Sequence, residues 1–488
     1  MARQRIPLEP FTLELLPDAK AKPDIAATRA GRTLAWNSHW GGQDQHFVLR
    51  SRFAVPRRWQ APALHLPLGV AGDIFTHPEA LLYVDGVPIA SADRYHHTID
   101  IPTAFVDGEP HELLLHGWTG LTGWPPDPED RSQLLLRECG VIDIARDLEA
   151  FLTLAETALD LQNVMTDHRP EKHAILSALD AAFLVLDTRD PMEEDFRASV
   201  APAHARLQHG LSKAGEPLDV TIHAAGHAHM DVAYLWPIAQ IRQKNARTYS
   251  NVLRLMERHP QFHFSHSQPQ LYAWTQEDYP EIFDKIRERV AEGRWEVLGG
   301  MWVEPDANMP GAESLVRQIL LARRFCDDTF GDEAECPVLW LPDTFGFPAC
   351  LPQLMAQAGL KWFVTNKVNW NQYNQMPAST TWWEGIDGSR VLAQFLTTPR
   401  GVQHLPFPTN YKSDLTAAEV VGTWTRNTMK DRVHDLLMAY GYGDGGGGPT
   451  DTLIRKAHAY RALPGAPRVE PSNVRRYFTA LEARAAAL

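Results

Sequence analysis

The spacing of hydrophobic positions changes twice along the 488-residue chain and divides it into three regions. In the first region, short runs such as residues 47–53 alternate apolar and polar side chains, which is the period of a half-buried β-strand. The pair Asp85-Gly86 follows another apolar run and is typical of a two-residue hairpin turn. We therefore expect residues 1–140 to form a β-sandwich-like accessory domain.

Residues 141–217 carry a helical period instead. Ile144, Leu148, Phe151 and Ala155 recur at the spacing of one face of an amphipathic helix. This pattern predicts a connector of two or three helices, which ends at a short glycine- and proline-containing linker.

From residue 218 to residue 488, predicted strands alternate with predicted helices. Two of the helices are expected at 240–258 and 281–291. Repeated βα units indicate a parallel sheet, so the sequence predicts a catalytic (β/α)7-type barrel in a multidomain chain. A hairpin is the alternative place for the predicted strand 391–395, because the turn signal Asp387-Gly388 precedes it. The seven predicted strands are 220–225, 262–266, 295–298, 338–341, 362–365, 391–395 and 436–440.

The segment after the first of these strands contains candidate metal ligands. Chemistry in such barrels lies at the carboxyl ends of the strands. In an extended segment His227, His229 and Asp231 point to one side, and an imidazole with a carboxylate can chelate zinc. The competing interpretation is that Asp231 caps the next helix.

Two further strand ends deliver carboxylates. Asp306 follows Gly299-Gly300 and Pro305, and Asp343 follows the strand at 338–341. Either residue alone is better explained as the N-cap of a helix. Together they match the pair that glycoside cleavage requires, one to protonate the leaving oxygen and one to attack or to activate water.

Composition limits the other classes of function. The net charge of −13 disfavours nucleic-acid binding and suits a neutral ligand such as a sugar. Four cysteines without a metal-ligand spacing are typical of a reduced, cytoplasmic protein. The N-terminal residues contain no signal-peptide core, and no run of 18 apolar residues predicts a membrane span.

The ordered motifs resemble those of glycoside hydrolase family 38. Residues 226–231 with Trp236-Pro237 resemble its first zinc motif, 299–306 its nucleophile motif and 340–346 its general-acid motif. The glycine-rich stretch 441–449 is similar to the signature of the cytosolic and bacterial α-mannosidases. Segments 44–47 and 83–86 are similar to the N-terminal domain of that branch.

This resemblance implies a retaining α-mannosidase that releases terminal α-linked mannose from oligosaccharides. It implies His229, Asp231 and Asp306 as ligands of Zn²⁺, or of another divalent ion such as Co²⁺. It further implies Asp306 as the nucleophile and Asp343 as the acid/base. Candidate substrate contacts are Tyr234, which stands where many relatives have tryptophan, together with His227 and Asp444.

The chain departs from the family in its last part. The resemblance implies a fourth ligand, a histidine beyond the barrel, but the later His404, His434 and His458 lack its context. The family also continues well beyond position 488, so we expect a fragment or truncated product with weakened metal binding and impaired hydrolysis. Its expected partner is a missing C-terminal half or a second copy. Two rival functions therefore stay open. One is a non-catalytic carbohydrate-binding fragment and the other is a barrel metal hydrolase such as a polysaccharide deacetylase.

Overall fold

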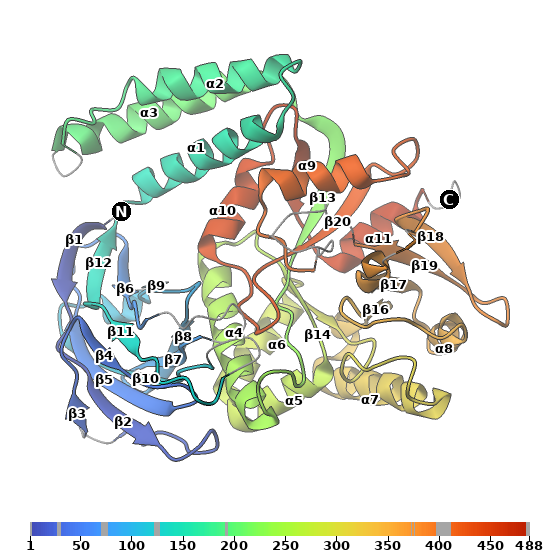
Figure 1. The fold of residues 1–488 in the computed structure, drawn as a ribbon, viewed down its shortest axis with the longest axis horizontal. Helices are drawn as coiled ribbons and strands as arrows, with labels where there is room; N and C mark the ends of the chain where they lie inside the picture. The colour runs from blue at the N-terminus through green and yellow to red at the C-terminus, as the bar shows by residue number, and fades with distance from the viewer. Residues whose placement is uncertain are drawn as a thin grey trace.

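A computed structural model describes residues 2–26, 31–69, 77–121, 127–190, 194–371, 373–374, 376–396 and 411–484. Antiparallel sheets from the N-terminal residues lie beside a mixed α/β region, and a layer of three helices lies along one edge of both (Figure 1). Within these ranges, no helix is both long enough and apolar enough to cross a lipid bilayer.

Two antiparallel sheets and a short ribbon make up the N-terminal region. The larger sheet has the order β3-β2-β5-β10-β7-β8 and the smaller one the order β1-β12-β6-β9. The larger consists of β2 (Thr12–Leu16), β3 (Arg32–Thr33), β5 (His46–Ala54), β7 (Glu79–Val84), β8 (Val87–Ala92) and β10 (Pro110–Trp118). The smaller consists of β1 (Ala2–Pro7), β6 (Pro62–His65), β9 (Thr98–Asp100) and β12 (Gly140–Ile144). The ribbon pairs β4 (Ser38–Trp40) with β11 (Leu134–Leu136).

Alternation of apolar and polar residues explains how these sheets share a core. In the central pair β5 and β10, Leu49 faces Leu115, and both side chains are buried. Leu64 of β6 and Val141 of β12 belong to the same hydrophobic cluster. The predicted hairpin turn at Asp85-Gly86 is confirmed, because it joins β7 to β8 in antiparallel pairing.

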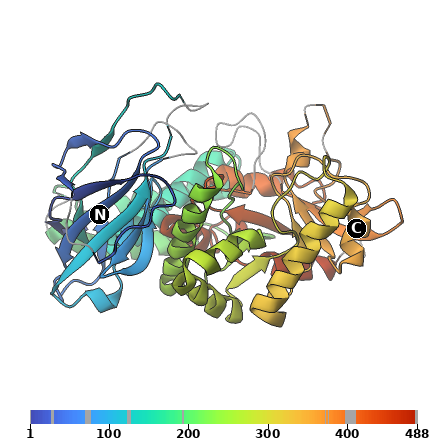
Figure 2. The same cartoon turned by 90° about the horizontal axis from the view of Figure 1, so that it is seen from below.

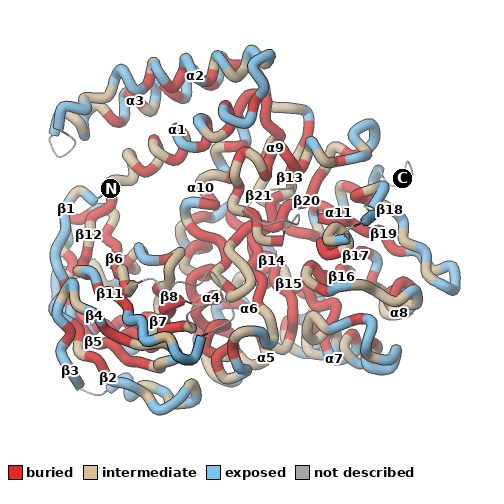
Figure 3. Tube along the Cα trace, in the orientation of Figure 1, coloured by how far each residue is buried: buried red, intermediate tan, exposed pale blue. Residues whose placement is uncertain are grey.

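Three helices occupy the region predicted as a helical connector. They are α1 (Arg146–Val164), α2 (Pro170–Phe183) and α3 (Glu194–Ser212). Phe151 and Ala155 of α1 and Leu179 of α2 point into the main hydrophobic cluster. The opposite faces of α2 and α3 are exposed, as expected for amphipathic helices at the surface (Figure 3).

The C-terminal region contains two sheets of mainly parallel strands. The first has the order β15-β14-β13-β20, with β21 also paired to β13, and the second has the order β16-β17-β19-β18. The first consists of β13 (Leu218–Gly226), β14 (Phe264–Ser267), β15 (Trp295–Leu298), β20 (Asp435–Tyr440) and β21 (Pro467–Pro471). The second consists of β16 (Val338–Trp340), β17 (Trp362–Thr365), β18 (Thr380–Glu384) and β19 (Arg390–Phe395).

These strands correspond to all seven predicted ones and add two that the sequence analysis missed. Strand β19 pairs in parallel with β17 and in antiparallel fashion with β18, so it belongs to the sheet and to a hairpin at once. The two added strands are β18, the partner of β19 in that hairpin, and β21, which pairs in parallel with β13. Strands β15 and β16 are neighbours in space, although the described residues show no hydrogen-bonded ladder between them. The arrangement is a mixed α/β fold with several sheets.

Helices cover the outside of these strands. The predicted helices at 240–258 and 281–291 are confirmed as α4 and α6, with bounds that differ by at most two residues. Helix α11 packs against the second sheet, where the ring of Phe478 stacks on that of Trp362 with centroids 5.1 Å apart. The helices are α4 (Ile238–Arg258), α5 (Pro269–Asp278), α6 (Pro280–Ala291), α7 (Ala312–Phe330), α8 (Leu351–Gln357), α9 (Ala417–Arg426), α10 (Asp451–Ala459) and α11 (Val474–Glu482).

Helix α4 packs against β7 and β8 of the N-terminal region and against α5 and α6 of the C-terminal region. In Figure 2 green helices lie next to the blue N-terminal sheets. Lys244 of α4 is 1% exposed, and its ammonium forms an ion pair with the buried carboxylate of Glu79 at the start of β7. The same ammonium lies 5.3 Å from the ring centre of Trp118 and 4.6 Å from that of Trp236. The N-terminal sheets therefore pack directly against the segment that leads into the candidate site.

Candidate metal and catalytic site

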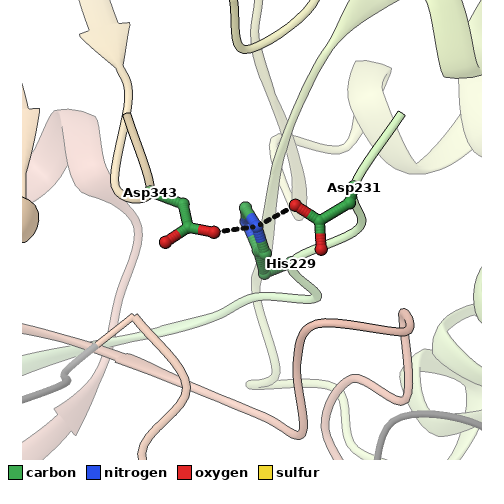
Figure 4. A group of neighbouring side chains, drawn as sticks. All are labelled: His229, Asp231 and Asp343. Atoms are coloured by element: carbon green, nitrogen blue, oxygen red, sulfur yellow. Dashed lines mark ion pairs between the residues drawn. The ribbon is translucent and has the colours of Figure 1, made fainter. Parts of the chain in front are cut away.

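The centre of the candidate site is the segment that follows β13. The strand ends at Gly226, and the next residues stay close to the neighbouring chain through an isolated bridge between Met230 and Gly445. His229 and Asp231, two residues apart, both reach the same point beyond the strand end (Figure 4). The side chain of His229 is only 2% exposed, while that of Asp231 is 25% exposed.

Three side chains gather there. Nε2 of His229 lies 3.4 Å from Oδ1 of Asp231 and 3.3 Å from Oδ2 of Asp343, which comes from the end of β16. One ligand atom from each residue can be chosen so that all lie within 4.8 Å of one another. The carboxyl ends of two parallel strands thus bring together an imidazole and two carboxylates, as expected for this class of sheet.

Glu304 is a third carboxylate at the same imidazole. Its Oε1 lies 3.6 Å from Nδ1 of His229, and its side chain is 8% exposed. Burial raises the pKa of Glu304, and the nearby imidazole only partly opposes this shift. Burial would lower the pKa of His229, but Glu304 and Asp231 together hold it well above its ordinary value. The surroundings therefore favour positive charge at this ring.

Asp306 lies at the rim of the same pocket, outside the group of three. Asp306 is exposed to solvent. Its Oδ1 accepts hydrogen bonds from the backbone N–H groups of Asn308 and Met309, both at 2.8 Å. These two bonds hold the pKa of Asp306 below its usual range. The carboxylate is thus ionised at neutral pH and accessible, and it also caps its own turn.

Asp343 is in a different environment. Burial would raise its pKa, but His229 and Lys367 hold it well below its ordinary value. The Lys367 ammonium forms an ion pair with Asp343, and the Tyr411 hydroxyl lies 3.1 Å from Asp343 Oδ1. The ring of Tyr411 also contacts that of His229, with centroids 4.8 Å apart. Asp343 is therefore an ionised carboxylate in these surroundings.

The glycine-rich stretch borders the site on the other side. Asp444 pairs with Lys412 at 2.8 Å, and its Oδ1 lies 3.2 Å from the Tyr411 hydroxyl. The N–H of Gly446 donates to the carbonyl of His229 at 3.0 Å. Gly446 has a φ of 75°, in the left-handed region that favours glycine, and an added Cβ atom would lie 2.8 Å from Oγ1 of Thr248. The stretch supports the backbone of the metal-binding segment.

The two remaining substrate candidates lie at different depths. Tyr234 is 51% exposed, with its ring edge-on to Trp236 at 6.1 Å. His227 is 1% exposed, and its Nδ1 lies 2.8 Å from the carbonyl of Ser265. The ring of His227 is 6.5 Å from that of His229.

Of the three later histidines, the structure describes His434 and His458, and both lie away from the site. His434 precedes β20, and its ring nitrogens lie near the carbonyls of Asp219 and Lys430, at the opposite end of the strands. His458 is exposed on α10. His404 lies outside the described residues.

Sequence reasoning did not single out Glu304, Lys367 and Tyr411 as site residues. Glu304 stands in the predicted nucleophile motif, two positions before Asp306, so its place at a strand end was visible. Lys367 follows β17 at another strand end. For Tyr411 the sequence offers no comparable signal, because no predicted strand precedes it directly.

The residues fit a divalent cation. Neither nitrogen of His229 has a hydrogen-bond partner among the described residues, although the ring is buried. The neighbouring carboxylates lie farther away than ordinary hydrogen bonds allow, at 3.3–3.6 Å. Imidazole and carboxylate are the ligand types that zinc and similar ions take. The pocket that contains this group has a volume of about 210 Å³ and also includes Asp306 and Phe345.

Carboxylates around one buried histidine, at the ends of parallel strands, define the class as a candidate metal-assisted hydrolase. The sequence profile of the N-terminal domain of glycosyl hydrolases family 38 matches residues 219–487. Human alpha-mannosidase 2C1 is 34% identical over 446 residues, which are 89% of this chain and 40% of the human protein. Alpha-mannosidase of Saccharomyces cerevisiae is 38% identical over 243 residues, 50% of this chain and 21% of the yeast protein.

A solved structure of an alpha-mannosidase from Enterococcus faecalis V583 aligns with a TM-score of 0.42 and 20% identity, over 55% of this chain and 30% of that one. The chain belongs to glycosyl hydrolase family 38, because the family profile covers more than half of its residues. It spans less than half the length of alpha-mannosidase 2C1 from human and mouse, 40% and 44% respectively.

Proposed function

We propose that this protein is a metal-dependent α-mannosidase that removes terminal α-linked mannose from oligosaccharides with retention of configuration. One observation carries the proposal: His229, Asp231 and Asp343 converge in a pocket that also contains Asp306. A buried imidazole among carboxylates supports a divalent cation, and an accessible, ionised carboxylate beside it supports a nucleophile. Membership of family 38 favours glycoside cleavage over deacetylation.

His229 and Asp231 would hold the cation, with Asp306 as the further ligand that the sequence motifs imply. The ion would be Zn²⁺ or another divalent metal such as Co²⁺, which supplies positive charge for binding the sugar hydroxyls. Asp306 is ionised and can attack the anomeric carbon. His227 is buried and would support the group, while Tyr234 and Asp444 would contact the sugar.

Asp343 has two candidate roles. The sequence motifs imply that it protonates the leaving oxygen. Its place beside Nε2 of His229 favours a metal ligand instead. As a proton donor, Asp343 would need a proton on its carboxylate, which requires substrate to separate it from the Lys367 ammonium. The Tyr411 hydroxyl, 3.1 Å from Asp343, is the nearest neutral proton donor.

We also propose the division into three parts, with residues 1–140 as a sandwich-like accessory domain, 141–217 as a helical connector and 218–488 as a (β/α)7-type catalytic barrel. The shared cluster of the two N-terminal sheets supports the first part, and the succession of parallel strands supports the last. Four unpaired cysteines support a reducing, cytoplasmic environment.

The direct test combines binding with turnover. We expect the metal-free chain to take up one Zn²⁺ or Co²⁺, measured by calorimetry and elemental analysis. We expect His229→Asn to lose this binding, while His209→Asn, at an exposed position on α3, keeps it. With metal added, hydrolysis of an aryl α-mannoside should release α-mannose as the first product. Proton NMR recorded during the reaction measures this configuration. Acetate release from an acetylated sugar, or β-mannose as the first product, would contradict the proposal. Sugar binding without turnover would favour a carbohydrate-binding fragment.

A further inference from the structure

The two nitrogens of His229 face different groups. Nε2 faces Asp231 at 3.4 Å and Asp343 at 3.3 Å, whereas Nδ1 faces Glu304 at 3.6 Å. The two nitrogens of an imidazole point in different directions, so a cation shared with Asp231 would meet Nε2 alone. Nδ1 then carries the proton, and the carboxylate of Glu304 is the acceptor that faces it.

We propose that Glu304 is a positioning residue: with the cation bound, its carboxylate would accept the Nδ1–H of His229 and thereby present Nε2 to the cation. In this structure the two atoms are 3.6 Å apart, longer than a hydrogen bond, so a small movement of either side chain would close the contact. This inference rests on the metal centre proposed above. A carboxylate behind a metal-binding histidine fixes its tautomer and ring orientation and makes it a stronger ligand. Glu304 acts through His229, because it lies on the Nδ1 side and outside the group of three ligand atoms.

The surroundings of Glu304 support this role. The Ser267 hydroxyl lies 3.3 Å from Oε1 of Glu304. The backbone N–H of Glu304 donates to Oε1 of Gln268 at 3.1 Å. The side-chain N–H of Gln268 donates to the carbonyl of Met230 at 2.8 Å, next to His229 in the chain. One residue after β14 thus fixes both the backbone of Glu304 and the segment that carries the histidine.

The burial of Glu304 points the same way. Its side chain is 8% exposed, and its Oε2 has no hydrogen-bond partner among the described residues. A buried carboxylate without a full set of partners is costly unless it serves a nearby positive group. His229 is the cationic or proton-bearing group in contact with it.

The test measures affinity for Zn²⁺ and Co²⁺ in the full chain, by competition with a chelating dye. Glu304→Met keeps the size but removes the acceptor, and we expect about 10- to 100-fold weaker binding. Glu304→Gln keeps a carbonyl that can accept the Nδ1–H, so we expect a smaller loss and an unchanged visible spectrum of bound Co²⁺. Glu313→Gln, at an exposed position on α7, is the matched control and should bind as the wild type does.

Each outcome decides the inference. Wild-type affinity in Glu304→Met overturns it, as does a Glu304→Gln protein that binds as weakly as His229→Asn. If Glu304→Met fails to unfold cooperatively on heating, Glu304→Asp replaces it, because the shorter side chain withdraws the acceptor and keeps the charge. That variant should also lose affinity, and wild-type affinity would overturn the inference. If the wild type and His229→Asn bind metal equally, the proposed metal centre itself is wrong.

Discussion

Asp306 and Asp343 follow neighbouring strands, yet their environments differ. Asp306 is exposed and receives two backbone N–H groups, whereas Asp343 is partly buried between His229 and Lys367. The difference is useful for a pair of catalytic carboxylates, because each can be assigned a separate task. It also allows the two roles to be tested separately.

Asp306→Asn is expected to reduce kcat on an aryl α-mannoside to the background rate. The amide keeps the size of the side chain but is not a nucleophile, and it is a poorer metal ligand. The control is Asp387→Asn, since Asp387 also accepts a backbone N–H two residues on, at 3.0 Å, in an exposed turn. A rate within about tenfold of wild type in Asp306→Asn would remove Asp306 from the chemistry.

Asp343→Asn separates the proton donor from the metal ligand. A donor matters mainly when the leaving group is poor, so kcat/KM should fall about 10²–10⁴-fold on a mannose disaccharide and far less on a dinitrophenyl mannoside. If Asp343 is a metal ligand, the substitution would instead weaken Zn²⁺ binding and reduce kcat/KM equally on both substrates. Comparing the two substrates, together with metal affinity, decides between these roles.

The alternation of an extended segment was sufficient to place His229 and Asp231 together. The strand ends pointed to Asp306 and Asp343, but with Asp306 as the third ligand and Asp343 as the acid/base. The structure instead brings Asp343 to His229 and leaves Asp306 at the rim of the pocket. Lys367 and Tyr411 could not be assigned in this way, because their contacts depend on how strand ends far apart in the chain meet. The sequence predicted that His227 points to the same side as His229, but not that its side chain would be fully buried. The two rings are 6.5 Å apart.

At the level of elements, the stretch 441–449 links the N-terminal sheets to the metal-binding segment. The ring of Tyr95, from the loop after β8, stacks on that of Tyr442 with centroids 4.0 Å apart and planes 7° apart. Nε2 of His96 lies 2.9 Å from the carbonyl of Pro449. Residues of the N-terminal region thus hold both ends of the stretch, whose middle contacts His229.

We expect Tyr95→Ala to weaken Zn²⁺ binding about two- to tenfold, since an aromatic pair contributes about 0.5–1.5 kcal/mol. The stretch should also become more sensitive to proteolysis, which mass spectrometry of the fragments would locate. Tyr373→Ala is the control, because Tyr373 is 91% exposed. Equal affinity and equal cleavage in both variants would mean that the stack does not support the site.

The elements themselves were predicted best where a period could be counted. The bounds of α4 and α6 agree with the helical pattern, and the parallel strands agree within about two residues. Strand β21 was missed because it is short and a proline stands at each end, which argues against a central strand. It pairs nonetheless with β13, since tertiary pairing overrides such local preferences.

For the whole molecule, buried histidines predict a loss of stability in acid. Burial lowers the pKa of His77 to about 4, and that of His116 and His266 to about 3. In the unfolded chain a histidine titrates near 6.5, so between about pH 6 and 4 the unfolded state binds more protons. Stability is thus present above about pH 6.5 and is lost as the pH falls.

Urea denaturation at pH 7, 6 and 5 checks this expectation. Each such histidine contributes about 1.4 kcal/mol per pH unit below its unfolded pKa. His116→Gln should reduce the slope of unfolding free energy against pH by that amount, whereas His209→Gln, at an exposed position, should leave it unchanged. An unaltered slope in His116→Gln would contradict the assignment.

The arrangement of the large parts was the least predictable feature. Alternating periods revealed sheets, helices and parallel strands in the right order. The hydrophobic pattern contained no information on which elements pack against one another, because α4 would be amphipathic whichever sheet it covered. Only the fold places Glu79 of β7 against Lys244 of α4 and so brings the N-terminal sheets against the C-terminal region.

The buried pair of Glu79 and Lys244 has a consequence for inheritance. A charge enclosed by Trp118 and Trp236 cannot lose its counter-ion without a large penalty. Glu79 also pairs with the buried guanidinium of Arg247 at 3.2 Å. Substitutions at positions 79, 244 and 247 should therefore occur jointly among homologues, with all three charges kept or all three replaced. Exchanging the N-terminal sheets between distant homologues should then succeed only where position 79 suits positions 244 and 247.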